Sequence, residues 1–473
     1  MFCRKDEGCD YEELEKRQTP CLCISKRYIV ALMVSLGYVG IYTARIQMSI
    51  GIIAMTTNNT HVGNGSSSSG YGTRFDWNLQ VQGYVLTAIY WGTVITQYPG
   101  GLLAKRFGGT VIFGLGVLGT ALCSLIIPWA STWGVYAVIT IRFLQGTFDG
   151  VTTPATMEIW TRWAPVQEKS QLVSLASVGV YMGCFFGLFV SGLLAETSLG
   201  WPLMFYFFGG VFVVWYLLWY ICIFESPESH TSISTGELEY LKNNAPHYLD
   251  IEKKSHKTPW FSILTSMPYW SLVSVHFAID WGLFMLMTDI STFMDNALHF
   301  EIKQNGLLAA LPYLFMSVMV VITGRVADWL INRKILTTTQ ARKLPLCGVP
   351  LLMCIIMITA GIYSQSALIT VICLSVTLIL QSATWSGVIV NFLDLSPNYS
   401  TVLVAISNAL AFLAGVVSPG LTGTLVNRGG REAWSIVFYI CSGLYLVSSA
   451  LYGIFGSGKT QSWDSETDAV CEE

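Results

Sequence analysis

Two short stretches decide the fold of this chain: GLLAKRFGG at residues 101–109 and GRVADW at residues 324–329. Each comes at the end of a long apolar run and places glycine, a small residue and then charged side chains there. Glycine lets two helices approach closely, and charged residues mark the points where apolar helices leave a membrane. Because the two stretches stand at equivalent positions in the first and second parts of the chain, they predict an internal repeat of two similar halves.

The composition agrees with a membrane protein. The 473 residues are 53% hydrophobic and only 12% charged, whereas soluble domains carry about 25% charged residues. The runs 29–54, 111–130 and 203–224 approach or exceed the ~20 residues that cross a bilayer as helix. The 22 Tyr and 16 Trp fit two interfacial aromatic belts. A net charge of −3 gives no basic surface for nucleic acid. We therefore expect an all-α protein whose partner is the lipid bilayer.

Twelve membrane spans divide into two groups of six. The expected domains are a tail (1–28), a first six-helix half (29–224), a linker (225–268), a second six-helix half (269–455) and a second tail (456–473). The expected spans are 29–54, 83–103, 110–130, 134–157, 171–195, 203–224, 269–293, 305–323, 346–364, 366–390, 400–425 and 434–455. An even number of spans places both termini on one side of the membrane.

The basic residues predict the orientation. With the N-terminus in the cytosol, 20 of the 26 Lys and Arg fall on the cytoplasmic side and four on the opposite side. Lys and Arg favour cytoplasmic loops, so both termini are predicted to be cytoplasmic. The sequons at Asn58 and Asn64 lie in the first loop on the opposite side, where they predict glycosylation.

Arg45 and Arg142 are the two cations expected inside the membrane. A buried charge costs at least about 2.5–3.5 kcal/mol on insertion scales, so it persists mainly where it pairs or works. Arginine offers a bidentate fork to a carboxylate or phosphate. We interpret Arg45 as an anion-binding residue, with snorkelling to the interface as the structural alternative.

Asp149 follows Arg142 by seven residues, which places both on nearly one face of the fourth span. The segment after it, Gly150 to Pro154, contains residues that loosen a helix. An acidic side chain that pairs with a nearby arginine can give up this salt bridge when it takes up a proton. The pattern therefore predicts proton coupling or substrate binding, and a static pair between helices is the alternative.

Asp280 and His276 form a second titratable pair, one turn apart in the seventh span. Such a pair at mid-membrane favours a proton relay. Hydrogen bonds to a neighbouring helix are an equally good explanation.

A nucleotide site and a metal site are both rejected. Residues Gly453 to Thr460 match the phosphate-binding loop pattern G-x-x-x-x-G-K-T, but they lie at the end of an apolar span without a preceding strand. The cysteines of the N-terminal tail match no zinc spacing. We expect no cofactor, no enzymatic activity and no nucleotide hydrolysis, so an ion gradient has to supply the energy.

Several motifs carry a family resemblance. Helix 2 reads ITQYPGG at 95–101 and AKRFGG at 104–109, helix 4 reads DGVT at 149–152, and NGLLAALPY stands at 305–313. With these motifs the chain resembles the anion–cation symporters of the major facilitator superfamily: sialin, the sodium–phosphate cotransporters and the vesicular glutamate transporters. The likeness extends over nearly the whole chain and implies the twelve-helix fold of two six-helix halves.

The resemblance implies roles for the charged residues. Arg45 and Arg142 match the family's anion-handling arginines, and Asp149 stands where the family has a glutamate linked to proton coupling. Leu86 and Ile279 replace a histidine and an arginine of the glutamate transporters, which places the chain nearer the sialin and sodium–phosphate branches.

The leading hypothesis is a secondary active transporter of small anions, which moves organic anions such as acidic sugars or acidic amino acids together with H⁺ by alternating access. Sodium-driven phosphate or organic-anion cotransport is the runner-up within the class. A sensor or binding protein that no longer transports is the alternative from another class. The sequence is compatible with a lysosomal, a vesicular or a plasma membrane.

Overall fold

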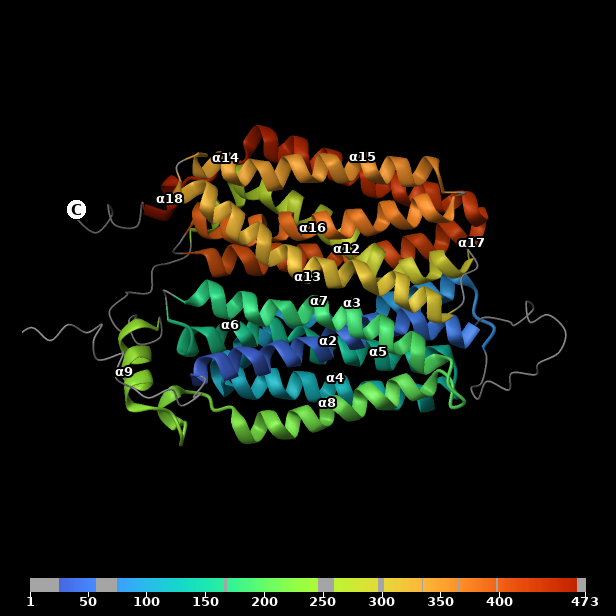
Figure 1. Cartoon of the computed structure of the whole chain (residues 1–473), viewed down its shortest axis with the longest axis horizontal. Coiled ribbons are helices and arrows are strands. Elements are labelled where there is room, and N and C mark those ends of the chain that lie inside the picture. Colours follow the sequence, from blue (N-terminus) through green and yellow to red (C-terminus); the bar gives the residue numbers. More distant parts are fainter. Residues whose placement is uncertain are drawn as a thin grey trace, which may run out of the picture.

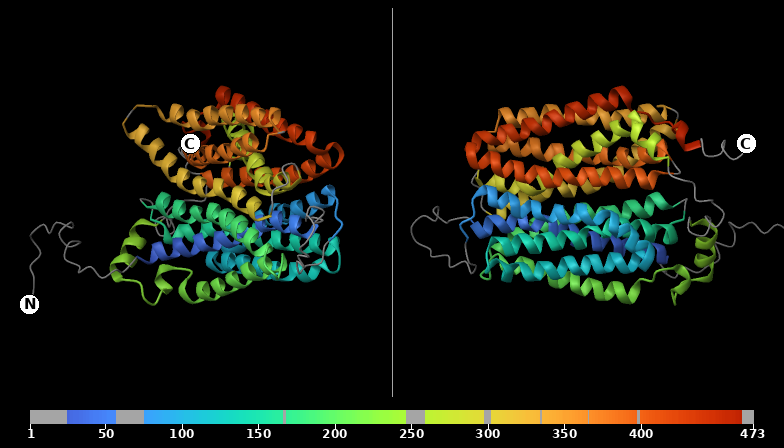
Figure 2. Two further views of the ribbon diagram at one scale, coloured as in Figure 1. Left: turned by 45° about the vertical axis from the view of Figure 1, so that its right-hand side comes forward. Right: turned by 180° about the vertical axis from the view of Figure 1, so that it is seen from behind.

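The structure is a computed structural model that describes residues 25–56, 75–165, 168–245, 259–296, 302–333, 335–364, 366–396 and 399–465. Throughout these ranges every regular element is a helix. Two helical bundles lie side by side, one from the first half of the chain and one from the second (Figure 1). Seen from two further sides, the bundles remain separate layers (Figure 2).

The first bundle contains six spans. Its helices are α2 (Lys26–Thr56), α3 (Leu79–Phe107), α4 (Gly109–Ser131), α5 (Val135–Gly150), α6 (Thr152–Trp163), α7 (Lys169–Ala195) and α8 (Pro202–Cys222). Helices α5 and α6 together form the fourth span, interrupted at Val151. A short 3₁₀ turn η1 (Pro227–Ser229), helix α9 (Thr235–Asn244) and helix α11 (Trp260–Thr265) belong to the linker.

The second bundle repeats this plan. Its helices are α12 (Met267–Asn296), α13 (Ile302–Asn332), α14 (Thr338–Lys343), the π-helical turn η3 (Leu344–Gly348), α15 (Val349–Ile362), α16 (Ala367–Leu395), α17 (Ser400–Phe455) and the short α18 (Ser462–Ser465). The helical run α17 contains two membrane-length segments, Val402–Val426 and Glu432–Phe455.

Nine helical segments in the described ranges are long and apolar enough to cross a bilayer. The other three expected spans are α3, the pair α5 and α6, and α13. Helices α5 and α6 are each too short alone. Helix α3 is long enough but contains Gln, Gly, Thr and Pro, which lower its mean hydropathy, and α13 contains the apolar helix Gly306–Val320. The all-α architecture of twelve spans is confirmed.

The two repeat stretches end their helices differently. In the first half α3 continues to Phe107, and Gly108 makes the turn with φ +98°, a conformation that glycine adopts without strain. The carboxylate of Glu225 accepts hydrogen bonds from the backbone nitrogens of Gly109 and Thr110, both at 3.0 Å, and so caps α4. In the second half GRVADW lies inside α13, which continues to Asn332, since no glycine pair follows it.

The outer surface of the bundles is apolar. Large exposed side chains include Leu217, Ile221 and Ile355, as expected where lipid rather than water is the neighbour. Trp129 and Trp133 are exposed near the end of α4, with ring centroids 4.1 Å apart. Such tryptophans suit the membrane interface.

The two ends of the molecule differ. We call the end where α2 begins and α9 lies the linker end, and the opposite end, where α2 reaches Thr56, the loop end (Figure 1). At the loop end the two bundles pack tightly. A β-carbon on Gly83 of α3 would lie 2.8 Å from the carbonyl oxygen of Pro419, and one on Gly306 of α13 would lie 2.9 Å from that of Leu188. The structure is therefore closed at the loop end.

A polar cluster joins the linker to the first bundle at the linker end. Arg27 donates from Nε to Glu168 at 2.8 Å, and its backbone nitrogen donates to Glu237 of α9 at 3.1 Å. The hydroxyls of Tyr28 and Tyr240 also donate to Glu168, at 3.2 and 3.3 Å. Partial burial works to raise the pKa of Glu168, but these hydrogen bonds and the charge of Arg27 outweigh it and lower that pKa.

Close packing of α3 on α5 gives a first prediction. A β-carbon on Gly146 would lie 1.9 Å from the carbonyl oxygen of Ile89, whereas one on Gly210 would meet nothing within 4 Å. Gly146→Ala should lower the free energy of unfolding by about 1–3 kcal/mol because of overpacking. Gly210→Ala should leave it unchanged or raise it slightly. Thermal unfolding of the purified protein in detergent measures both, and equal midpoints would contradict this packing.

The lowered pKa of Glu168 gives a second prediction. A depressed carboxyl pKa adds stability above its unfolded value of about 4.3, and that stability is lost as the pH falls through the folded value. The thermal midpoint of the wild type should therefore fall more steeply between about pH 5 and pH 3 than that of Glu168→Gln. Glu239→Gln, at an exposed position of α9, should keep the wild-type slope. An unchanged slope in Glu168→Gln would refute the prediction.

Candidate functional site

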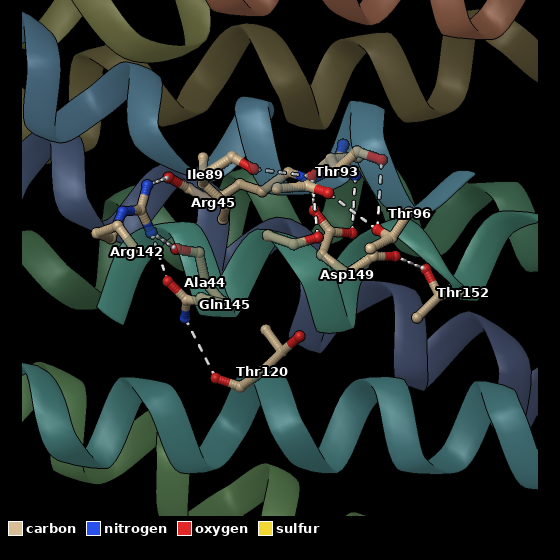
Figure 3. Close-up of polar contacts among 12 residues, drawn as sticks. Ala44, Arg45, Ile89, Thr93, Thr96, Thr120, Arg142, Gln145, Asp149 and Thr152 are labelled. Carbon is tan, nitrogen blue, oxygen red and sulfur yellow. Dashed lines mark hydrogen bonds and ion pairs between the residues drawn. The ribbon is translucent and has the colours of Figure 1, made fainter. Parts of the chain in front are cut away.

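The centre of the first bundle holds a buried ion pair between Arg45 and Asp149, the central ion pair (Figure 3). Arg45 lies in α2, about 28 Å along the helix from its start. Its Nε donates to Oδ2 of Asp149 at 2.7 Å, and its Nη2 donates to Oδ1 at 2.8 Å. The two side chains are 2% and 0% exposed. This two-pronged geometry is the strongest arrangement of guanidinium and carboxylate.

A helix break positions Asp149. Helix α5 ends directly after it, Val151 interrupts the span, and α6 begins at Thr152. The Thr152 hydroxyl donates to the carbonyl oxygen of Asp149 at 2.6 Å, and Pro154 has no N–H to continue the α5 ladder. Thr93 of α3 donates to Oδ2 of Asp149 at 3.2 Å as a third partner. The loosened segment expected after Asp149 is thus confirmed.

Arg142 is buried but does not pair with Asp149, although the two lie on one helix. Its Nη1 donates to the carbonyl oxygen of Ala44 at 2.9 Å and to Oε1 of Gln145 at 2.7 Å, and its Nη2 donates to the carbonyl oxygen of Arg45 at 3.3 Å. Gln145 in turn donates to Thr120 of α4 at 3.2 Å (Figure 3). Arg142 therefore fixes the backbone of α2 beside the central ion pair, and Asp149 is left to Arg45.

Arg45 also faces the second bundle. Its guanidinium carbon lies 4.5 Å from the ring centroid of Tyr42 and 5.2 Å from that of Phe412 in α17, both within cation–π distance. In the described part of the chain, Nη1 of Arg45 has no hydrogen-bond partner. It is a buried donor on a residue already in contact with both halves.

Two tyrosines complete this region, and the sequence analysis missed both. Tyr90 of α3 and Tyr313 of α13 are fully buried, and within the described ranges their hydroxyls have no partner. Tyr90 lies within electrostatic range of Arg45, and Tyr313 within range of Tyr90. Their signal in the sequence was a tyrosine in the middle of a span, away from the interfacial belts. Among the described residues, a hydroxyl without a partner from the first bundle thus lies near the guanidinium, and one from the second bundle lies near Tyr90.

His276 and Asp280 lie on α12 in the second bundle and are both buried. Nε2 of His276 is 3.9 Å from Oδ2 of Asp280, too far for a hydrogen bond. The other ring nitrogen, Nδ1, is 2.7 Å from the hydroxyl of Ser407. The geometry thus brings the two residues near each other without a direct proton path, and the relay stays a prediction.

The phosphate-loop pattern at Gly453 to Thr460 folds as a helix end. Helix α17 ends at Phe455, and the backbone nitrogen of Gly458 donates to the Thr339 hydroxyl at 3.3 Å. Among the described residues no three His, Cys, Asp or Glu side chains gather as a metal site would require. The sequons at Asn58 and Asn64 lie outside the described residues.

Comparisons with known proteins agree with this architecture. The family model of the Major Facilitator Superfamily matches residues 35–419. Vesicular glutamate transporter 1 of Xenopus tropicalis is 33% identical over 99% of this chain and 82% of its own length. Vesicular glutamate transporter 2 of Homo sapiens is 32% identical over 98% of this chain and 80% of its own length.

Solved structures show the same fold. The crystal structure of a D-xylose–proton symporter matches with a TM-score of 0.68 at 15% identity, covering 91% of this chain and 99% of its own. A bacterial homologue of the human lysosomal transporter Spinster, in an inward-facing and occupied conformation, matches with a TM-score of 0.67 at 14% identity, covering 90% and 96%. At these identities the likeness concerns the fold alone.

The central ion pair gives a third prediction. Removing one partner leaves a buried charge unpaired, so Arg45→Gln and Asp149→Asn should each lower the free energy of unfolding by about 3–5 kcal/mol. The double variant should be much more stable than the sum of both losses implies, because no charge is left unpaired. Glu228→Gln breaks the pair with Lys242, whose side chains are 50% and 47% exposed, and should change stability by less than about 1 kcal/mol. Thermal unfolding in detergent tests the cycle, and additive losses would contradict the coupling.

Proposed function

Because the chain belongs to the anion–cation symporter family of the major facilitator superfamily, we propose that it is a proton-coupled transporter of organic anions whose substrate binds at Arg45. That it is a secondary transporter, and not an enzyme, follows from the family. The substrate and the coupling ion are the proposed part.

The central ion pair is the observation that carries the proposal. Asp149 now satisfies two of the nitrogens of Arg45, while Nη1 stays without a partner among the described residues. A carboxylate substrate needs donors of this kind, and it competes with Asp149 for them. Anion binding and the ionised form of Asp149 therefore oppose each other at one guanidinium.

Proton coupling follows from this competition. When Asp149 takes up a proton, its attraction for Arg45 weakens and the guanidinium becomes free to hold the substrate anion. The buried charge then stays balanced, because the substrate replaces the lost carboxylate charge. Loading with proton and anion together costs less than loading with either one alone, which is the requirement for symport.

Arg142 supports the site through the backbone. Its donors hold the carbonyl oxygens of Ala44 and Arg45, so it fixes the segment of α2 from which the Arg45 side chain extends. We assign Arg142 an assisting role, in which it positions Arg45 and adds positive charge that attracts the anion.

The proposed placement is a multi-pass membrane protein with both termini in the cytoplasm. The bias of Lys and Arg toward the linker end supports this orientation. The loop end, which is closed in the structure, would then face the lumen or the outside. Rocking of the two bundles about the site would open each side in turn.

A fourth prediction tests the function in proteoliposomes with an imposed proton gradient. The panel contains sialic acid, glutamate, aspartate, urate and phosphate, each with and without sodium. Proton-stimulated uptake of an organic anion should be lost in Arg45→Ala, because the substitution removes the guanidinium that contacts both bundles, while the donors of Arg142 are engaged with carbonyl oxygens. Asp149→Asn should transport without a response to the gradient, and Asp149→Glu should keep the response, since it restores an acid.

The control is Lys242→Ala, which removes an exposed cation of α9 and should transport like the wild type. Uptake of phosphate that requires sodium would replace the proposal by the sodium-coupled alternative. Binding of an anion by the folded protein without uptake would favour the alternative of a sensor or binding protein that does not transport.

A further inference from the structure

Asp280 is a buried carboxylate that the proposed cycle does not use. It lies on α12 in the second bundle and is 4% exposed. Within the described ranges Oδ1 has no hydrogen-bond partner, and Oδ2 has only His276 at 3.9 Å. An ionised carboxylate in this state is costly, so the ionised form needs a partner that the described residues do not supply.

Its place in the fold points toward the substrate path. Helices α2 and α12 both start at the linker end and therefore run parallel, and the Ser49 hydroxyl of α2 donates to the carbonyl oxygen of Thr288 on α12 at 2.8 Å. Counting back from this contact, Arg45 precedes Ser49 by about one turn and Asp280 precedes Thr288 by about two turns. The two residues thus lie about one turn apart in height on facing helices of opposite bundles, within electrostatic range of each other.

Two further acceptors without a partner in the described ranges lie on, or in contact with, the same stretch of α12. Gln381 donates its amide to the carbonyl oxygen of Ile279, the neighbour of Asp280, and its own Oε1 has no partner among the described residues. Nε2 of His276 also lacks a hydrogen-bond partner there, and it is an acceptor when Nδ1 carries the proton and donates to Ser407. A carboxylate, an amide oxygen and an imidazole nitrogen are three acceptors, and an ammonium group has three protons to donate.

We propose that Asp280 binds the ammonium group of the substrate, so that the transported anion carries an ammonium group as well as a carboxylate. The inference rests on the proposed anion site at Arg45. Arg45 would hold the carboxylate from the first bundle, and Asp280, with Gln381 and His276, would hold the ammonium from the second. The substrate would bridge the two bundles by its two charges.

The pairing of individual charges favours an ammonium ligand over a plain anion. With Asp149 protonated and Asp280 ionised, Arg45 is a cation and Asp280 an anion that lack a charged partner among the described residues. An anion that lacks an ammonium group would leave the ionised Asp280 without a partner. The negative charges of Asp280 and of the anion would then repel each other. A substrate with a carboxylate and an ammonium group pairs Arg45 and Asp280 at once, while Arg142 keeps its carbonyl partners.

The test compares matched substrates that differ by one amino group: glutamate with glutarate, and aspartate with succinate. Uptake into proteoliposomes is measured for the wild type, Asp280→Asn, Asp280→Glu and the control Asp76→Asn, which makes the same chemical change at an exposed residue. The wild type should prefer the amino-bearing member, and Asp280→Asn should reduce that preference by about tenfold or more, as expected when a charged acceptor is lost. Asp280→Glu should keep part of the preference, and Asp76→Asn all of it.

A binding measurement on the wild type keeps the test decisive if Asp280→Asn does not fold. Glutamate or aspartate should raise its thermal midpoint more than glutarate or succinate at equal concentration. Equal transport of both members, or a wild-type preference in Asp280→Asn, overturns the inference. The inference is also overturned if Asp280→Asn changes the pH dependence of uptake for every anion but keeps the preference for the amino-bearing member, because Asp280 is then a proton site. If any of these results is found while anion uptake still depends on Arg45, the proposed function stands and only the role of Asp280 is wrong. If no anion is taken up in an Arg45-dependent way, the proposed function and this inference are both overturned.

Discussion

The ion pair of Arg45 with Asp149 is the interaction that the packing of the first bundle has to accommodate. A charge at this depth is costly unless it has a charged partner and further hydrogen bonds. Thr93 supplies one of these bonds from α3, and it can reach Asp149 only because α3 packs directly on α5. That contact depends on small residues: a β-carbon on Gly92 would lie 2.2 Å from the carbonyl oxygen of Phe143, and one on Gly150 would lie 2.5 Å from that of Thr93. The glycines of both helices are therefore a condition for the buried charge.

The two bundles contribute unequally to the central region. The first provides both arginines and Asp149, whereas the second provides Phe412 against the guanidinium and the separate acid Asp280. Each bundle is also tied internally at the linker end, the first through Arg27 and Glu168, and the second through Arg342, whose Nε donates to Asp394 at 2.7 Å. Such ties within each bundle, together with packing between bundles at the loop end, suit two rigid bodies that move against each other.

Much of the fold and of the candidate site was predictable from the sequence, because placing a polar or charged group in the hydrocarbon core of a bilayer costs free energy. Span number and length follow from the apolar runs, and the cost of a buried charge made Arg45, Arg142 and Asp149 candidates at once. The pairing was not predictable. Asp149 has Arg142 on its own helix, yet its partner Arg45 is 104 residues away in the chain. Helical periodicity describes neighbours on one helix, and only the tertiary arrangement of α2 and α5 within the bundle decides which guanidinium reaches the acid. Tyr90 and Tyr313 were missed for the same reason, since they matter only where two bundles meet.

This difference between local pattern and packing also bears on the proposed proton coupling at Asp149. A pair formed within one helix would travel with that helix and keep its geometry through any rocking motion. A pair formed between α2 and α5 depends on the distance between two helices, and that distance is fixed by Arg142, which holds the backbone carbonyls of α2. Protonation of Asp149 removes the attraction but leaves the Arg142 bonds in place. The guanidinium can then change partner while its helix stays in position, as the proposed anion site requires if it is to reload in every cycle.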